Sequence, residues 1–213
     1  MQMFGFDIHE IIIFIVPVLL AITIHEVAHG YTAYLLGDPT AKMAGRLTLN
    51  PIKHLDPIGA LALLLVKVGW AKPVPINPIY FKDKKRDILL VSAAGPLSNF
   101  IMAIIFSLII KPIIMLFGSV QNSALVSFFS LIIEICSAGI IVNIGLGLFN
   151  LLPIPPLDGS NILASLLPDK ISASFMRFGK YGFIVLILLF FTGTVHKLIL
   201  PILYFFVSKL LPG

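Results

Sequence analysis

Two histidines separated by three residues, with a glutamate directly after the first, are the most chemically distinctive feature of the chain. They are His25, Glu26 and His29, within residues 23–30. Side chains four positions apart lie on one face of a helix, so both imidazoles can bind the same divalent metal ion. Glu26 then lies close enough to act on a water molecule at that metal. The spacing therefore predicts a metal-dependent hydrolytic site.

A purely structural role is the alternative interpretation of this stretch. Two buried histidines could hydrogen-bond to carbonyl groups on neighbouring helices instead of binding a metal. The segment around them is strongly apolar, and unpaired polar groups in lipid are costly. The spacing, the glutamate and the apolar surroundings together favour the metal site.

A third ligand is needed, because a catalytic zinc ion usually has three protein ligands and one open position. The acidic candidates within or beside the apolar segments are Glu134 and Asp158. We favour Asp158, because it follows three prolines, and irregular backbone at membrane depth is tolerated where it lines protein or a water-filled cavity. The alternatives are a turn or helix cap for Asp158 and pairing with a polar group on a neighbouring span for Glu134.

The chemistry expected of such a site is the hydrolysis of a peptide bond. A zinc ion is a Lewis acid and lowers the pKa of a water molecule bound to it from ~16 to ~7. Glu26 would accept the proton and pass it to the leaving amine. A further donor would stabilise the developing oxyanion, and the candidates are Asn150, eight residues before Asp158, and Asn143. Hydrogen bonding between helices is the alternative role for both asparagines.

The composition indicates the environment in which these residues must be positioned. Of the 213 residues, 58% are hydrophobic and only 12% are charged, whereas soluble domains carry about 25% charged residues. We therefore predict an all-α polytopic membrane protein with a single domain over residues 1–213. The net charge of +5 is explained by orientation in the membrane and does not indicate a nucleic-acid partner.

The apolar segments predict five to six membrane-spanning helices. Three long ones cover about residues 8–36, 88–117 and 123–152, and two closing helices, 181–192 and 195–211, lie within about 178–211. The segment 59–70 is shorter than the ~20 residues of a span and is expected to be re-entrant or interfacial; if it crosses, the spans number six. Residues 43–51 show a short alternation of apolar and polar types, which predicts a small strand or β-hairpin region after the first helix, with its edge at residues 46–50.

Basic residues predict the orientation. Nine of the fifteen Lys and Arg residues lie between Lys42 and Arg86, and such clusters mark the cytoplasmic ends of spans. Five spans with an external N-terminus and the last helix ending at Lys209 on the cytoplasmic side fit this distribution. The cluster 82–86 is expected to contact anionic lipid of the cell membrane.

Three motifs, at residues 25–29, 95–99 and 150–159, resemble in sequence order the three signatures of the site-2 protease family of intramembrane zinc metalloproteases. Residues 37–42 and 45–51 resemble its compact bacterial and archaeal branch. Many members carry a PDZ or CBS domain, and no segment of this chain is polar and long enough for either. The resemblance covers a catalytic core of about residues 8–167.

The resemblance implies the site residues and the substrate class. One zinc ion would be bound by His25, His29 and Asp158, with Glu26 as the base. The site would be reached from the cytoplasmic side and would cleave membrane-spanning protein or peptide substrates. Asn150 matches a family position that holds substrate or oxyanion, and Asn99 in the second motif is a further candidate for that role.

A non-catalytic membrane protein that binds metal, such as a transporter or chaperone, is the alternative function. The presence of Glu26 argues against it, because a structural zinc site needs no base. Within the enzyme hypothesis, an extended substrate could add to the edge of the predicted strand 46–50. The sequence does not indicate which oligomeric state the protein has.

Overall fold

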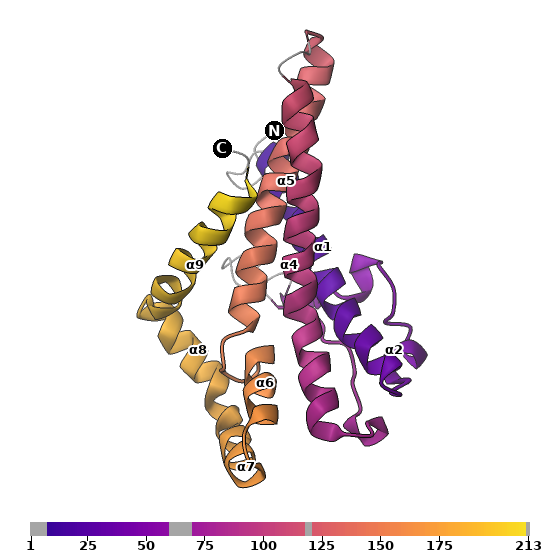
Figure 1. Cartoon of the computed structure of the whole chain (residues 1–213), viewed down its shortest axis with the longest axis vertical. Coiled ribbons are helices and arrows are strands. Elements are labelled where there is room, and N and C mark those ends of the chain that lie inside the picture. The colour runs from indigo at the N-terminus through magenta and orange to yellow at the C-terminus, as the bar shows by residue number, and fades with distance from the viewer. Residues whose placement is uncertain (1–7, 60–69, 118–120, 212–213) are drawn as a thin grey trace.

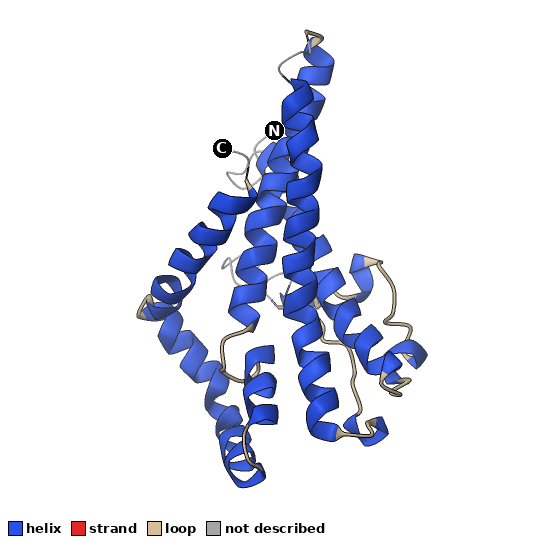
Figure 2. Ribbon diagram, in the orientation of Figure 1, coloured by secondary structure: helices blue, strands red, loops and turns tan. Residues whose placement is uncertain are grey.

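Long helices build most of the molecule (Figures 1 and 2). The computed structural model describes residues 8–59, 70–117 and 121–211. Helices α1 (Ile8–Leu35), α4 (Lys84–Phe117) and α5 (Ser123–Asn150) pack against one another along their lengths. These bounds match the three long predicted spans closely. Most of the predicted short segment 59–70 lies outside the described residues.

Four helical stretches in the described part of the chain are long and apolar enough to cross a membrane. They are Ile12–Leu35, Lys84–Phe117, Ser123–Asn150 and Asp169–Phe191. Helices that are apolar all round suit a lipid environment, because their backbone groups are satisfied internally. The helical membrane-protein class is thus confirmed, although four candidate spans are fewer than the five to six predicted.

The interface between α4 and α5 depends on small residues. Buried side chains of the two helices form one apolar cluster that includes Phe106, Ile110 and Ile140. A Cβ atom at Gly139 would lie 2.7 Å from the Phe106 ring, and one at Gly147 would lie 2.8 Å from the ring of Phe100. Glycine at these two positions therefore lets the helices approach closely enough to bury aromatic rings, as is common between membrane helices.

The C-terminal helices run back along the molecule in one direction. The short helix α6 (Asp158–Leu166) is followed by α7 (Asp169–Phe178), α8 (Gly182–Phe191) and α9 (Thr194–Leu210). Figure 1 shows α8 and α9 continuing from α7 toward the end at which α4 and α5 join. Ser107, in the second half of α4, donates a hydrogen bond to the carbonyl of Leu210 at 2.5 Å.

Helices α8 and α9 therefore do not form two crossings in opposite directions. The predicted return of the chain to the basic face at Lys209 is wrong. Gly193, with a φ of 70°, is in the left-handed region that glycine adopts at little cost. It bends the chain between α8 and α9 without reversing it.

The predicted strand at residues 46–50 is not found among the described residues. The connection between α1 and α4 contains instead the short helices α2 (Thr40–Met43), η1 (Pro51–Lys53) and η2 (Pro78–Tyr80), and one isolated antiparallel bridge, Leu55 to Ala71. The neighbouring segment 72–78 contains three prolines, which have no N–H to donate to a β-ladder. Its carbonyls at positions 72 and 73 accept from the side chain of Arg46.

Candidate metal centre

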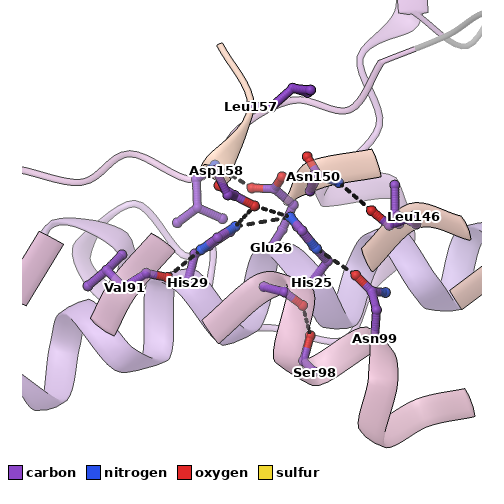
Figure 3. Close-up of polar contacts among 12 residues, drawn as sticks. His25, Glu26, His29, Val91, Ser98, Asn99, Leu146, Asn150, Leu157 and Asp158 are labelled. Carbon is purple, nitrogen blue, oxygen red and sulfur yellow. Dashed lines mark hydrogen bonds and ion pairs between the residues drawn. The ribbon is translucent and has the colours of Figure 1, made fainter. Parts of the chain in front are cut away.

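Helix α1 presents His25 and His29 on one face, one turn apart (Figure 3). Their Nε2 atoms lie 3.0 Å from each other, and the rings meet edge to face with centroids 4.6 Å apart. Both side chains are buried. The helical spacing read from the sequence thus brings the two imidazole nitrogens to a single point.

Helix α6 brings Asp158 to the same point. Its Oδ2 atom lies 3.1 Å from Nε2 of His25 and 3.3 Å from Nε2 of His29. A Cβ at Gly159 would lie 2.5 Å from the carbonyl oxygen of Leu152. Glycine at this position therefore allows the first turn of α6 to fold against the end of α5 and deliver the carboxylate. The three ligand atoms lie within 4.8 Å of one another.

The outer nitrogens of both rings are already bonded. Nδ1 of His29 lies 2.7 Å from the carbonyl oxygen of Val91, and Nδ1 of His25 lies 2.7 Å from Oδ1 of Asn99. Both partners are acceptors, so in the neutral ring the proton is on Nδ1 and the Nε2 lone pair points inward.

The donor set fits a zinc ion. Two imidazole lone pairs and a carboxylate oxygen converge, and Oδ2 of Asp158 is buried without a hydrogen-bond partner. A cation is the natural occupant of such a cluster, and two nitrogens with one oxygen are typical of a catalytic zinc site. Of the described residues, these are the ones whose ligand atoms gather in this way.

The electrostatic environment keeps Asp158 in its anionic form. Burial raises the pKa of its carboxyl group, but the contacts with His25 and His29, which carry positive charge when protonated in the metal-free site, lower that pKa by more. The pKa of Asp158 therefore lies below its ordinary value, and the group is a carboxylate at neutral pH, as a metal ligand must be.

Gly95 of α4 is a site residue that the sequence did not single out. A Cβ at this position would collide with Nε2 of His29 and lie 2.7 Å from Cε1 of His25. The absence of a side chain is what lets α4 pass directly beside both imidazoles. The sequence feature that could have identified Gly95 is its position as the first residue of the second motif, residues 95–99.

Asn99 and Asn143 lie on the far side of His25 from Asp158. Both are fully buried. Nδ2 of Asn99 donates to the carbonyl of Ala21 at 3.2 Å and to Oδ1 of Asn143 at 3.0 Å, and Nδ2 of Asn143 donates to the carbonyl of Gly139 at 2.8 Å. Asn99 is thus bonded to the His25 ring and Asn143 to Asn99, and contact of these two residues with substrate or oxyanion stays a prediction.

Glu26 and Asn150 lie on the same side of the histidine pair as Asp158 (Figure 3). Oε2 of Glu26 accepts a hydrogen bond from the backbone N–H of Val74 at 2.8 Å. Nδ2 of Asn150 donates to the carbonyl of Leu146 at 3.0 Å, which leaves its second amide hydrogen for another acceptor. Both groups are half-buried, so each combines a fixed position with access to the site.

Glu134, the other acidic candidate, is not near the cluster. Its carboxylate lies 3.7 Å from Nε2 of His9, and both side chains are about half exposed. Glu134 thus lies beside a polar side chain near the start of the neighbouring helix α1, and its pairing there stays a prediction.

Comparison with known proteins agrees with this site. Residues 13–191 match the family described as Peptidase family M50. The chain is 43% identical over 190 residues to YwhC of Bacillus subtilis, which is named as a zinc metalloprotease; the match covers 89% of this chain and 84% of that protein. It is 28% identical to Rip2 of Mycolicibacterium smegmatis, also named as a zinc metalloprotease, over 88% of this chain and 70% of that protein. No solved structure matches the chain.

Proposed function

The chain belongs to peptidase family M50, the site-2 protease family, and is a zinc metalloprotease of the membrane; from this premise we propose that it is an intramembrane endopeptidase. Its substrates are other membrane proteins, which it cleaves in or near their transmembrane segments. The observation that carries the proposal is the convergence of three ligand atoms beside Glu26, within helices apolar enough to span a bilayer.

The proposed metal ligands are Nε2 of His25, Nε2 of His29 and the carboxylate of Asp158. When bound, zinc supplies Lewis acidity, which polarises a carbonyl and makes water more acidic. The hydrogen bonds from Nδ1 of both rings hold the imidazoles in the tautomer and orientation that ligation needs. Burial of the cluster keeps bulk water from competing for the ligands.

Glu26 is the proposed general base and acid. It accepts a proton from the attacking water as the new C–O bond forms at the scissile carbonyl carbon. It then delivers this proton to the amide nitrogen as the C–N bond breaks, so that the products are a carboxylic acid and an amine. Its half-buried position beside Asp158 supports this role (Figure 3).

Asn150 is the proposed donor to the substrate carbonyl oxygen. One hydrogen of its amide group is bonded to the carbonyl of Leu146, and the side chain lies on the same side of the histidine pair as Glu26 (Figure 3). A fixed donor aimed at a developing negative charge stabilises the transition state without reorganisation.

Access from the cytoplasmic side is part of the proposal. The start of α4, with four basic residues in 82–86, and helix α7, with Lys170 and Arg177, lie at the same end of the molecule (Figure 1). The last turn of α4 and the first turn of α5 lie at the opposite end (Figure 1). Since Lys and Arg gather at cytoplasmic ends of spans, the basic end would face the cytoplasm and contact anionic lipid.

The test compares two carboxylate neutralisations in a purified, zinc-loaded enzyme. Glu26→Gln is expected to keep its zinc and to lower cleavage of a transmembrane model substrate by about 10²–10⁴-fold, because it removes general base catalysis. Glu134→Gln is the matched control, and its cleavage should equal that of the parent. Cleavage by Glu26→Gln at the parental rate would overturn the proposal.

A further inference from the structure

An extended segment of the connection between α1 and α4 reaches the proposed base. We call residues 72–77 the strap. The backbone N–H of Val74 donates to Oε2 of Glu26 at 2.8 Å, across 48 positions of sequence. Pro73 and Pro75 flank Val74 and have no N–H. The strap therefore offers a single backbone donor at this point, and that donor is bonded to Glu26.

Arg46 fixes the part of the strap that precedes Val74. Its Nη2 donates to the carbonyl of Lys72 at 2.6 Å and its Nη1 to the carbonyl of Pro73 at 3.1 Å. Hydrogen bonds from an ionised donor are stronger than neutral ones, and the planar guanidinium fixes direction as well as distance. Arg46 is 7% exposed, so these bonds are largely shielded from water.

Two further bonds hold the ends of the strap. The N–H of Lys72 donates to the carbonyl of His54 at 2.9 Å, and the N–H of Asn77 donates to Oδ2 of the fully buried Asp38 at 2.6 Å. The strap is thus tied at its start, before Val74 and at its end.

Packing sets the distance between the strap and α1. Val74 is buried, and a Cβ at Gly30, one turn beyond Glu26, would lie 2.9 Å from its Cγ1 atom. Only a glycine leaves space for the Val74 side chain there. The close contact brings the Val74 amide within hydrogen-bond distance of the carboxylate.

We propose that Arg46 and the strap are positioning elements for Glu26. Arg46 orients the Pro73–Val74 peptide, and the amide of Val74 holds Oε2 so that Oε1 is presented for proton transfer. Among the described residues no hydrogen bond reaches Oε1. This inference rests on the proposed function, in which Glu26 exchanges protons with water and the leaving amine.

Positioning of this kind should affect turnover more than substrate binding. A carboxylate displaced by ~1 Å can lose ~10²-fold in rate, while substrate contacts and zinc ligands are untouched. We therefore expect loss of the strap bond to lower kcat, with little change in KM and full zinc content.

The first experiment removes the N–H and keeps everything else as similar as possible. Val74→Pro deletes the amide hydrogen, and Val74→Ala trims the side chain and keeps that hydrogen. In the zinc-loaded enzyme, kcat of Val74→Pro should fall at least tenfold below that of Val74→Ala, with KM within about twofold. Equal kcat values for the two folded variants would overturn the inference.

The second experiment needs no catalysis and no metal. Hydrogen–deuterium exchange, resolved to the Val74 amide by overlapping peptides that begin or end beside it, follows this donor in the metal-free protein. Exchange at this amide should be slow in the parent and at least tenfold faster in Glu26→Ala and in Arg46→Gln. Equal exchange rates at this amide in the parent and in Glu26→Ala would overturn the inference. This test does not depend on whether Val74→Pro folds.

Conservative replacement of Arg46 separates positioning from mere stability. Arg46→Gln should lower kcat about tenfold, and Arg46→Lys, which keeps one charged donor, should recover part of that loss at equal zinc content. An unchanged kcat in folded Arg46→Gln would overturn the role of Arg46. Should Glu26→Gln cleave normally, the proposed function fails; should it be inactive while Val74→Pro turns over like Val74→Ala, only the strap inference fails.

Discussion

The helices that hold the site and the helices that close the chain use their residues in opposite ways. In α1, α4 and α5, polar side chains such as His25, Asn99 and Asn143 are almost completely buried, and each is bonded to a partner. In α8 and α9 large apolar side chains face outward, and Phe191 is 88% exposed. The first group must satisfy every polar atom, whereas the second presents an apolar surface that suits lipid.

From this contrast we expect the effect of a substitution on zinc binding and stability to depend on the contacts of the replaced residue and not on the number of atoms added or removed. One added methyl group beside the histidines should lower zinc binding and activity more than the removal of a whole phenyl group from α8. Four substitutions test this comparison, beginning with the one expected to have the largest effect.

Gly95→Ala should have the largest effect. Its Cβ would collide with Nε2 of His29, so either the imidazoles or α4 must move, and zinc affinity should fall by ~100-fold or more. Zinc content after dialysis and cleavage of a model substrate measure the loss. Gly145→Ala in α5 is the control, because open space surrounds that position; full zinc retention in Gly95→Ala would contradict the collision.

Asn99→Leu should come second. It leaves the Nδ1–H donor of His25 and the Oδ1 acceptor of Asn143 buried without a partner, which costs about 1–3 kcal/mol in stability. Loss of such an orienting partner lowers metal affinity by ~10–100-fold. A competition titration with a zinc chelator gives the affinity, and the midpoint of thermal unfolding gives the stability. Parental values for both would show that the Asn99 contact does not orient the ring.

Asn143→Leu should have a smaller effect on zinc than Asn99→Leu. Asn143 contacts Asn99 and not the imidazole itself, so its influence on His25 passes through one more hydrogen bond. We expect zinc affinity to fall by less than about tenfold. The loss of stability should be similar to that of Asn99→Leu. The same titration ranks the two variants, and a larger zinc loss in Asn143→Leu would contradict this order.

Phe191→Ala should have the smallest effect. The side chain is almost fully exposed, and surface substitutions usually change stability by less than ~0.5 kcal/mol. Zinc content and cleavage rate should equal those of the parent in detergent. A clear loss of zinc would show that α8 supports the site and would remove the contrast between the two regions.

Much of this architecture follows from local patterns. The apolar runs gave the three long helices within a few residues, and the helical period placed His25 and His29 on one face. Asp158 was favoured because irregular, proline-rich backbone in an apolar chain must line protein or water. These are the features for which the physical requirement is local, or for which few alternatives exist.

The remaining features depend on contacts between distant segments. Nothing near Gly95 in the sequence shows that its bare face meets two imidazoles, and nothing near Val74 shows that its amide reaches Glu26. The alternation at 46–50 resembled a strand, but a strand needs a partner with N–H donors, and the prolines of the neighbouring strap remove them. The direction of the closing helices depends on tertiary contacts, such as those of α9 with α5, which their composition does not encode.

The position of Asp158 has a consequence for how the enzyme is made. The two histidines belong to α1, whereas the carboxylate belongs to α6 and is therefore synthesised only after α4 and α5. A nascent chain halted before residue 158 therefore has the base but an incomplete ligand set. We expect such a chain to bind zinc weakly and to lack hydrolytic activity until residue 158 has been added.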